Sequence, residues 1–325
     1  METTSGVETT YLESNVIVYP DKPKPTKESA TKSLLSSLAS AVLFVTVSYL
    51  VFDWDLTSIF VLAGVIFFHE LGHFAAMKFY NYKDVSMFFV PFFGAFVSGT
   101  KDQISQKQSA VILLAGPLPG VLLGAVLYYF SLANNNDFLL NTANSMIFIN
   151  LFNLLPIIPL DGGRLIKCLF FERSELIGSI FSYLSIGALF YYSITSQSYF
   201  LMLVPGFLML QLFAQSQLKK TKKAVLDKGI NINKSYDELS NEEYWLIRDE
   251  IGKNIQAFSK YMTPGKYEIS ENEQKLIGQV KAVIQKEPIQ DLKVGGKILF
   301  TAIWILSFII PFVIIGVSMV LTGSF

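Results

Sequence analysis

The sequence has 325 residues, of which 51% are hydrophobic and only 16% are charged. Its mean hydropathy of +0.43 excludes an ordinary soluble domain and indicates a polytopic membrane protein. Lys plus Arg and Asp plus Glu each total 26, so the balanced charge gives no reason to expect a nucleic-acid partner. The one cysteine, Cys168, excludes an internal disulfide and fits a small apolar core residue.

The first 32 residues are polar and include a stretch in which prolines alternate with charged residues, Pro-Asp-Lys-Pro-Lys-Pro at 20–25. No apolar run precedes Ser33, so this part of the chain lacks the core of a cleavable signal peptide. Its composition predicts a disordered cytoplasmic tail over 1–32.

Apolar runs long enough to cross a bilayer recur along the rest of the chain. A hydrocarbon core of about 30 Å needs about 20 helical residues. Such runs lie at 33–52, 56–80, 108–132, 138–160, 174–196, 198–216 and 298–322. We therefore expect an all-α polytopic fold with about seven transmembrane helices: a six-span core over 33–216 and a last span in 298–325.

The distribution of charge predicts the orientation of these spans. With the N-terminus in the cytoplasm, all 26 Lys and Arg residues fall in cytoplasmic segments or at cytoplasmic helix ends. The opposite turns carry only Asp53, Asp55 and Asp137. The positive-inside rule therefore favours a cytoplasmic N-terminus, in a multi-pass protein of a lipid bilayer.

Two segments between the spans have their own character. Residues 85–100 are aromatic and apolar, too short to span, and interrupted by Pro91 and Gly94, so we expect a short hairpin of β type that dips into the membrane. Residues 217–297 are polar. A capping box at 240–243, followed by apolar residues at helical spacing, predicts a small helical cytoplasmic insert with a second helix around Ile277–Ile284.

The second apolar run contains the motif His69-Glu70-Leu71-Gly72-His73. Positions four apart share a helix face, so His69 and His73 can each turn an imidazole nitrogen toward one Zn²⁺. Glu70 lies beside that face and can reach a water at the metal. The alternative is a hydrogen-bonded packing pair, but a membrane-buried glutamate between the histidines would then need a partner of its own.

A catalytic zinc site needs three protein ligands and one open position. The chain has no third histidine, so the third ligand should be an acidic residue. Asp161 follows Pro156 and Pro159, which interrupt the helix, and precedes Gly162-Gly163, which permit a sharp turn. It stands at the cytoplasmic end of its predicted span, as the histidines do. A helix-terminal Asx turn is the alternative role for Asp161.

The motif with its two histidines, the later Asn-x-x-Pro-x-x-Pro-Leu-Asp-Gly-Gly at 153–163, and the aromatic Pro-Phe-Phe-Gly at 91–94 resemble the site-2 proteases, which are intramembrane zinc peptidases. The resemblance covers 56 to about 170, and no PDZ or CBS domain is recognisable. It implies a zinc-dependent endopeptidase of prokaryotic membranes that cleaves a membrane-spanning substrate or a remnant signal peptide near the cytoplasmic side. Oligomeric state is left open.

The resemblance also implies a role for each site residue. His69, His73 and Asp161 would bind zinc, and Glu70 would act as general base and pass its proton to the leaving amine. Asn153 matches the asparagine proposed to bind the substrate carbonyl or oxyanion, with Asn150 as the second choice; an interhelical hydrogen bond is the alternative for Asn153. The hairpin residues Phe92, Phe93 and Gly94 would contact an unwound substrate as an added strand, or anchor the chain at the interface.

Three rival functions follow from the same residues. A seven-span prenyl-peptide protease also has a His-Glu-x-x-His helix, but it expects a glutamate as third ligand. A non-catalytic scaffold acting through the 217–297 insert has no need of Glu70. Metal transport would require polar residues in several spans, and this chain has one cluster.

Overall fold

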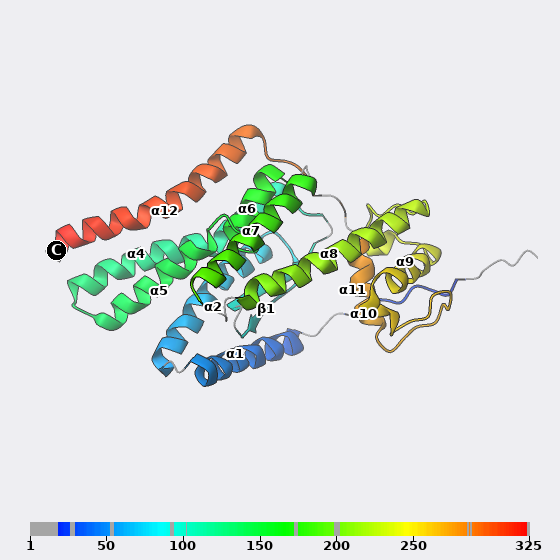
Figure 1. The fold of residues 1–325 in the computed structure, drawn as a ribbon, viewed down its shortest axis with the longest axis horizontal. Coiled ribbons are helices and arrows are strands. Elements are labelled where there is room, and N and C mark those ends of the chain that lie inside the picture. Colours follow the sequence, from blue (N-terminus) through cyan, green and yellow to red (C-terminus); the bar gives the residue numbers. More distant parts are fainter. Residues whose placement is uncertain are drawn as a thin grey trace, which may run out of the picture. The chain divides into compact units, whose positions relative to one another are not determined.

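The computed structural model describes residues 19–26, 30–52, 55–91, 94–101, 103–171, 175–197, 202–284, 286 and 288–323. These residues form two compact units, shown in Figure 1. The membrane unit comprises Thr26–Ser216 and Gln285–Phe325, and the insert unit comprises Met1–Pro25 and Gln217–Ile284. Each unit is described by itself below.

The membrane unit is helical except for one hairpin. Its elements are α1 (Ala30–Phe52), α2 (Leu56–Phe79), β1 (Lys83–Val90), β2 (Gly94–Thr100), α3 (Gln106–Ala115), α4 (Pro117–Ala133), α5 (Asp137–Asn153), α6 (Asp161–Ile166), the π-helix η1 (Lys167–Phe171), α7 (Glu175–Thr195), the first part of α8 (Leu203–Asp227), and α12 (Val294–Thr322).

Five helical segments among the described residues are long and apolar enough to cross a membrane. They are Leu34–Val51, Leu56–Phe79, Gln106–Ala133, Leu176–Thr195 and Val294–Thr322. The predicted count of about seven is not confirmed. The predicted span 138–160 is only the 17-residue helix α5, because the chain leaves the helix after Asn153 on approaching Pro156 and Pro159. Residues 203–216 of the predicted span 198–216 belong to α8, and residues 198–201 lie outside the described residues. Helix α8 continues into a lysine-rich sequence because lysine is a good helix former.

The predicted hairpin is confirmed as a two-stranded antiparallel sheet, in which Phe88 pairs with Phe96 and Met87 with Val97. Helix α1 covers the outer edge of β1. The Ser37 hydroxyl donates to the carbonyl oxygen of Met87 at 2.5 Å, and the backbone N–H of Phe89 donates to Ser40 Oγ at 3.0 Å. These side chains occupy hydrogen-bonding groups that an edge strand would otherwise expose.

Helix α12 packs against the core of the membrane unit. Phe300 of α12 is buried in a cluster with Val121 of α4 and Leu165 of α6. The chain before α12 is fixed to the start of α3, because Asp291 Oδ2 accepts a hydrogen bond from the Ser105 hydroxyl and its Oδ1 accepts from the Lys107 N–H at 3.0 Å. Helix α12 begins at Val294, four residues before the predicted span.

The insert unit is a small helical bundle. It contains the end of α8, the 3₁₀ turn η3 (Tyr236–Glu238), α9 (Asn241–Asn254), α10 (Gln256–Ser259) and α11 (Glu273–Val283). The predicted capping box is present, with Ser240 and Glu243 exchanging hydrogen bonds at the start of α9. Buried Arg248 of α9 donates to Glu273 of α11 at 2.9 Å, which joins the two helices inside an aromatic core.

Within the tail predicted over 1–32, residues 30–32 begin helix α1, and residues 19–25 make ordered contacts. This stretch lies against the insert unit, where the Trp245 indole N–H donates to the carbonyl oxygen of Pro20. The reason is that its prolines supply carbonyl acceptors that aromatic donors of the unit can bind. The remainder of the predicted tail before Tyr19 lies outside the described residues.

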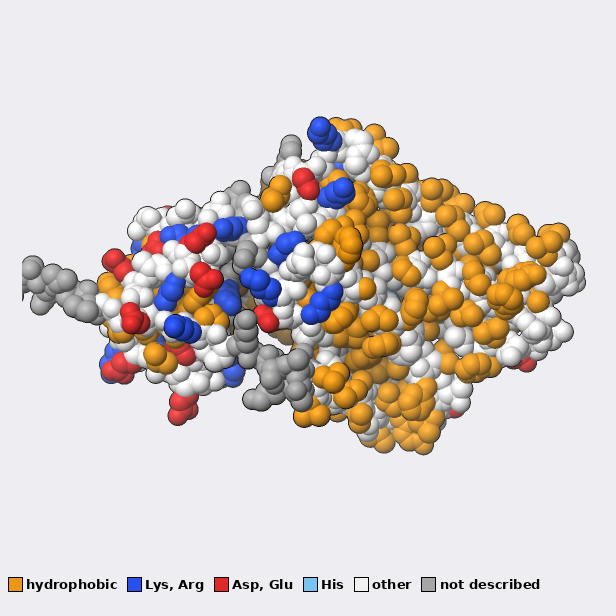
Figure 2. All heavy atoms as spheres, turned by 180° about the vertical axis from the view of Figure 1, so that it is seen from behind, with side chains coloured by type: hydrophobic (Ala, Val, Ile, Leu, Met, Phe, Trp, Pro, Cys, Tyr) orange, Lys and Arg blue, Asp and Glu red, His pale blue; other side chains and the backbone are white. Residues whose placement is uncertain are grey.

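The surface composition differs between the units. On the face shown in Figure 2, hydrophobic side chains cover most of the membrane unit, while Lys, Arg, Asp and Glu side chains gather on the insert unit and at one end of the membrane unit. Exposed residues of the membrane unit include Leu50, Phe60, Phe148, Leu210 and Leu321, each at least 60% exposed. Apolar surface of this extent fits lipid contact, and the chain is a multi-pass membrane protein.

We expect Asp291→Ala to lower the stability of the membrane unit at neutral pH by about 1–2 kcal/mol, because two hydrogen bonds to a carboxylate are lost. Burial alone would raise the pKa of Asp291, but the bonds from Ser105 and Lys107 outweigh it and hold the pKa below its usual value. The stabilisation is therefore present above the unfolded pKa of about 4 and is lost as pH falls through the lower folded pKa. Thermal unfolding from pH 7 to pH 3 checks this, and a difference between wild type and variant that grows on acidification would contradict it.

Candidate metal centre

The two histidines of α2 face one point inside the membrane unit. His69 and His73 are one helical turn apart and are 4% and 8% exposed. Their Nε2 atoms are 3.1 Å from each other, and the rings meet edge to face. The helix therefore places two nitrogen ligands together, as the spacing of the motif predicts.

Asp161, the first residue of α6, completes this cluster. Its Oδ2 atom lies 3.1 Å from His69 Nε2 and 3.0 Å from His73 Nε2. A tetrahedral zinc ion with bonds of about 2.0–2.1 Å holds its ligand atoms roughly 3.3 Å apart, close to these separations. His69, His73 and Asp161 form the group of potential metal ligands found among the described residues. Two nitrogens and one carboxylate oxygen fit Zn²⁺.

The second ring nitrogen of each histidine is held by a carbonyl oxygen. His69 Nδ1 lies 2.8 Å from Asn150 Oδ1, and His73 Nδ1 lies 2.7 Å from the backbone oxygen of Ile112. A carbonyl oxygen can only accept, so Nδ1 of each ring carries the proton. The Nε2 lone pairs are then directed at the shared point, as a metal-ligating histidine requires.

Glycines allow the helices to approach the histidines closely. A Cβ atom placed at Gly116 would lie 2.3 Å from His73 Nε2, and one placed at Gly120 would lie 2.2 Å from Asn150 Nδ2. A Cβ atom at Gly72 would overlap the carbonyl oxygen of Ala115. Gly116, between α3 and α4, and Gly120 in α4 thus have a packing role that keeps space for the site.

The loop before Asp161 is held from two sides. Gly162 lies so close to Leu154 that a Cβ atom would be 1.9 Å from its carbonyl oxygen. The same oxygen accepts a hydrogen bond at 2.8 Å from the indole N–H of Trp304 in α12. Helix α12 therefore fixes the end of α5, from which the chain turns toward Asp161.

The structure places the other predicted site residues as follows. Glu70 is buried on α2 beside His69. Asn153 is half-buried and donates from Nδ2 to the carbonyl oxygen of Ile149 at 3.0 Å. Gly94 lies at the hairpin turn with φ +90°, and Phe92 and Phe93 lie outside the described residues.

Asn150 is completely buried, with both polar atoms engaged. Its Oδ1 faces His69, and its Nδ2 donates to the carbonyl oxygen of Met146 at 2.7 Å. The sequence predicts substrate binding for Asn150 and does not predict this contact with His69. The only sign in the sequence of a histidine acceptor at Asn150 is an asparagine within an apolar helix. The sequence gives no sign of the Ile112 acceptor, because a backbone carbonyl group is common to all residues.

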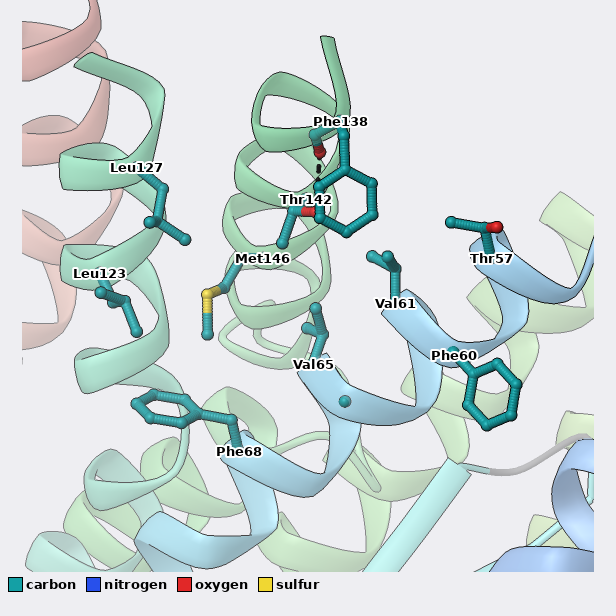
Figure 3. Close-up of a pocket in the computed structure, with 11 residues that line it drawn as sticks. Thr57, Phe60, Val61, Val65, Phe68, Leu123, Leu127, Phe138, Thr142 and Met146 are labelled. Atoms are coloured by element: carbon teal, nitrogen blue, oxygen red, sulfur yellow. Dashed lines mark hydrogen bonds between the residues drawn. The ribbon is translucent and has the colours of Figure 1, made fainter. Parts of the chain in front are cut away.

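An apolar cavity of about 560 Å³ lies beside the cluster, between α2, α4 and α5 (Figure 3). Val65, one helical turn before His69, and Met146, one turn before Asn150, both point into it. Gly64 also lines the cavity, and an added Cβ atom at this position would meet no other atom within 4 Å. The remaining lining residues are Thr57, Phe60, Val61, Phe68, Leu123, Leu127, Phe138 and Thr142.

Residues 57–146 match the model of peptidase family M50. This segment matches the site-2 protease family. The resemblance is therefore confirmed over residues 57–146. The matched segment contains both histidines and Glu70, and it ends before Asp161.

Two curated relatives of the M50 segment support the same family. The chain is 32% identical over 114 residues to Stage IV sporulation protein FB of Bacillus subtilis, covering 34% of this chain and 38% of that protein. It is 30% identical over 125 residues to a zinc metalloprotease of Methanocaldococcus jannaschii, covering 37% of this chain and 36% of that protein. The matches thus span little more than a third of either relative.

A solved structure was also found, that of the site-2 protease from Methanocaldococcus jannaschii. The TM-score is 0.40 at 22% sequence identity, covering 54% of this chain and 84% of that chain. The matched family is a peptidase family, and the archaeal relative is itself named a zinc metalloprotease.

A pair of matched substitutions separates the two asparagines of α5. Asn150→Ala removes the acceptor that orients His69 and should weaken zinc binding about 10- to 100-fold. Asn153→Ala, one turn away on the same helix, leaves both histidines supported and should bind zinc like wild type. Zinc affinity, measured by competition with a chromophoric chelator, checks this, and equal affinities for the two variants would contradict the role given to Asn150.

Proposed function

We propose that this protein is a zinc-dependent endopeptidase that cleaves a peptide bond within or beside the membrane-spanning segment of another protein. The observation that carries the proposal is the buried cluster of His69, His73 and Asp161, in which both histidines have their coordinating nitrogens directed at one point. Glu70, the group needed for proton transfer, is buried beside that cluster. Membership of the M50 segment in a peptidase family supports it.

In the proposed reaction, His69, His73 and Asp161 would hold the metal. A bound Zn²⁺ would supply Lewis-acid chemistry, polarising a substrate carbonyl and lowering the pKa of a water molecule toward neutral pH. Glu70 accepts the proton from the attacking water and then donates it to the leaving amine. Asn153 contributes an amide N–H donor for the substrate carbonyl oxygen, which becomes negatively charged during the reaction. For this role the Asn153 side chain must give up its hydrogen bond to the Ile149 carbonyl oxygen. Burial of the site excludes bulk water and strengthens these interactions.

The hairpin supplies an edge on which an unwound substrate can pair. Because Met87 and Phe89 turn their backbone groups toward α1, their neighbour Phe88 must bond to Phe96 in β2. The backbone groups of Ala95 and Val97 then point away from β1. Helix α1 closes the β1 edge, so strand addition is directed to β2.

The apolar cavity between α2, α4 and α5 suits the part of the substrate that remains in the membrane. Its lining is apolar apart from two threonines, and it reaches within one helical turn of His69. Side chains of a transmembrane segment can fill it without desolvating polar groups. We further propose that the N-terminus is cytoplasmic and the site lies near the cytoplasmic side of a prokaryotic membrane, as the positions of the 26 basic residues favour.

Glu70→Gln should reduce cleavage by at least about 10³-fold, because the amide cannot accept the proton, while zinc content stays near that of wild type. The measurement compares membrane-protein fragments, by mass spectrometry, in cells that produce either form at equal levels. Removal of the metal with a chelator should abolish the activity of purified wild type, and added Zn²⁺ should restore it. Full cleavage activity of the Glu70→Gln form would contradict the proposal. Changes in the membrane-protein fragments that are the same for both forms would favour a non-catalytic scaffold.

Val97→Pro should lower kcat/KM at least about tenfold, because proline removes an outward N–H that an added substrate strand would use. Val97→Ala retains the N–H and serves as the matched control. Kinetics on a substrate found in the fragment comparison would show the difference. Equal kinetics of the two variants, with zinc content unchanged, would contradict strand addition at this edge.

A further inference from the structure

The insert unit holds residues 19–25, here called the N-terminal segment, on a surface built from η3, α9 and α11. Trp245 and Asn241 come from α9, Tyr236 comes from η3, and Gln274 comes from α11. The ring of Tyr267 packs against Tyr19 with the ring centroids 4.9 Å apart. Aromatic side chains that also carry hydrogen-bond donors are the usual lining of grooves that bind proline-rich segments.

Two proline carbonyl groups contact the aromatic donors. The Trp245 indole N–H donates to the oxygen of Pro20 at 2.7 Å, and the Tyr236 hydroxyl donates to the oxygen of Pro23 at 2.7 Å. These prolines are three residues apart, which is one turn of a polyproline II helix, so their carbonyl groups share a side. Because proline restricts φ, such a segment loses little conformational freedom on binding.

A pocket of backbone carbonyls binds the side chain of Lys22. Its Nζ donates to the carbonyl oxygens of Tyr236 at 2.9 Å, Asp237 at 3.1 Å and Leu239 at 2.5 Å. It also lies 5.4 Å from the centre of the Tyr236 ring. Three acceptors match the three N–H donors of an ammonium group, so the pocket selects lysine.

The neighbouring hydrogen bonds show which groups of the N-terminal segment the insert unit recognises. The Lys22 backbone N–H donates to Asn241 Oδ1 at 3.0 Å, and Asn241 Nδ2 donates to Asp21 Oδ1 at 2.9 Å. Lys24 contributes its backbone oxygen, which accepts from Gln274 Nε2 at 3.2 Å. The recognised pattern is therefore Pro-Asp-Lys-Pro, in which Asp21 and Lys22 are bound through their side chains, and the following Lys24 is bound through its backbone oxygen alone.

We propose that the insert unit is a peptide receptor for extended Pro-Asp-Lys-Pro segments, and that the N-terminal segment is its built-in ligand, which the same pattern in another protein can replace. The contacts that hold it go to carbonyl oxygens, one backbone N–H, one aromatic ring and the side chains of Asp21 and Lys22. None of them requires the ligand to be continuous with α1. This inference does not depend on the proposed protease activity.

The covalent link gives the N-terminal segment an advantage over a competitor. A ligand on the same chain as its receptor acts at an effective concentration set by the connecting chain, on the order of millimolar for short flexible tethers. A free peptide must exceed that level to displace it from wild type. Substitution of Lys22 in the chain weakens the built-in ligand and leaves the receptor residues intact, so the groove then accepts a peptide at lower concentration.

The test measures binding of a fluorescent peptide with the sequence of residues 19–26 to the full-length Lys22→Met chain in lipid nanodiscs, by fluorescence anisotropy. We expect saturable binding. A peptide carrying Lys22→Met should bind at least about tenfold more weakly, because it loses the charge-assisted bonds. A peptide carrying Lys24→Met is the matched control and should bind like the unmodified one. Absence of saturable binding, or equal weakening by both substitutions, would overturn the proposal.

Receptor variants and the wild-type chain provide independent checks. Adding Tyr236→Phe and Asn241→Ala to the Lys22→Met chain should reduce peptide binding at least about tenfold, and unchanged binding would place the peptide elsewhere and refute the proposal. In the wild-type chain, millimolar unlabelled peptide should speed hydrogen exchange at the Lys22 amide. If that amide stays protected at the highest peptide concentration, the segment is a permanent part of the unit and the proposal is wrong.

Discussion

The site depends on two hydrogen bonds that determine where the histidine protons lie. Asn150 and the Ile112 carbonyl each accept from an Nδ1 atom, and this leaves both Nε2 atoms free to coordinate. Without them, two imidazoles and a carboxylate at 3.0–3.1 Å would form an ordinary hydrogen-bonded cluster. With them, the three groups present lone pairs to a common point, which costs free energy in a membrane protein unless a cation is bound there.

The surrounding fold brings those acceptors close to the histidines. Helix α4 can lie against α2 and α5 because Gly116 and Gly120 have no side chains, and Gly162 lets the loop before Asp161 pass beside Leu154. Trp304 of helix α12 donates a hydrogen bond to the backbone carbonyl oxygen of Leu154. A helix from the far end of the sequence thus supports a ligand loop that lies outside the matched M50 segment.

The sequence indicates the cluster of His69, His73 and Asp161 more clearly than it indicates the number of membrane spans. Helical periodicity and the scarcity of histidine predicted His69, Glu70 and His73, and prolines and glycines around Asp161 predicted a turn that could return an acidic group to them. The contact of Asn150 with His69 was not predictable, because the helix rotation of α5 depends on packing against Gly120. Hydropathy alone predicted a span over 138–160, whereas Pro156 and Pro159, which the sequence already marks as a helix interruption, shorten it to a helix that ends at Asn153. Residues 19–25 were assigned to a disordered tail because composition does not reveal a binding groove formed by residues more than 200 positions away.

The most direct test of the metal centre is X-ray absorption spectroscopy at the zinc edge on the purified full-length chain. The account predicts one zinc ion with two imidazole nitrogens and a carboxylate oxygen at about 2.0–2.1 Å, and loss of the zinc from the Asp161→Ala variant but not from Asp137→Ala, whose carboxylate is exposed at the other end of α5. Absence of zinc, a sulfur ligand from Cys168, or an unchanged spectrum in Asp161→Ala would contradict it.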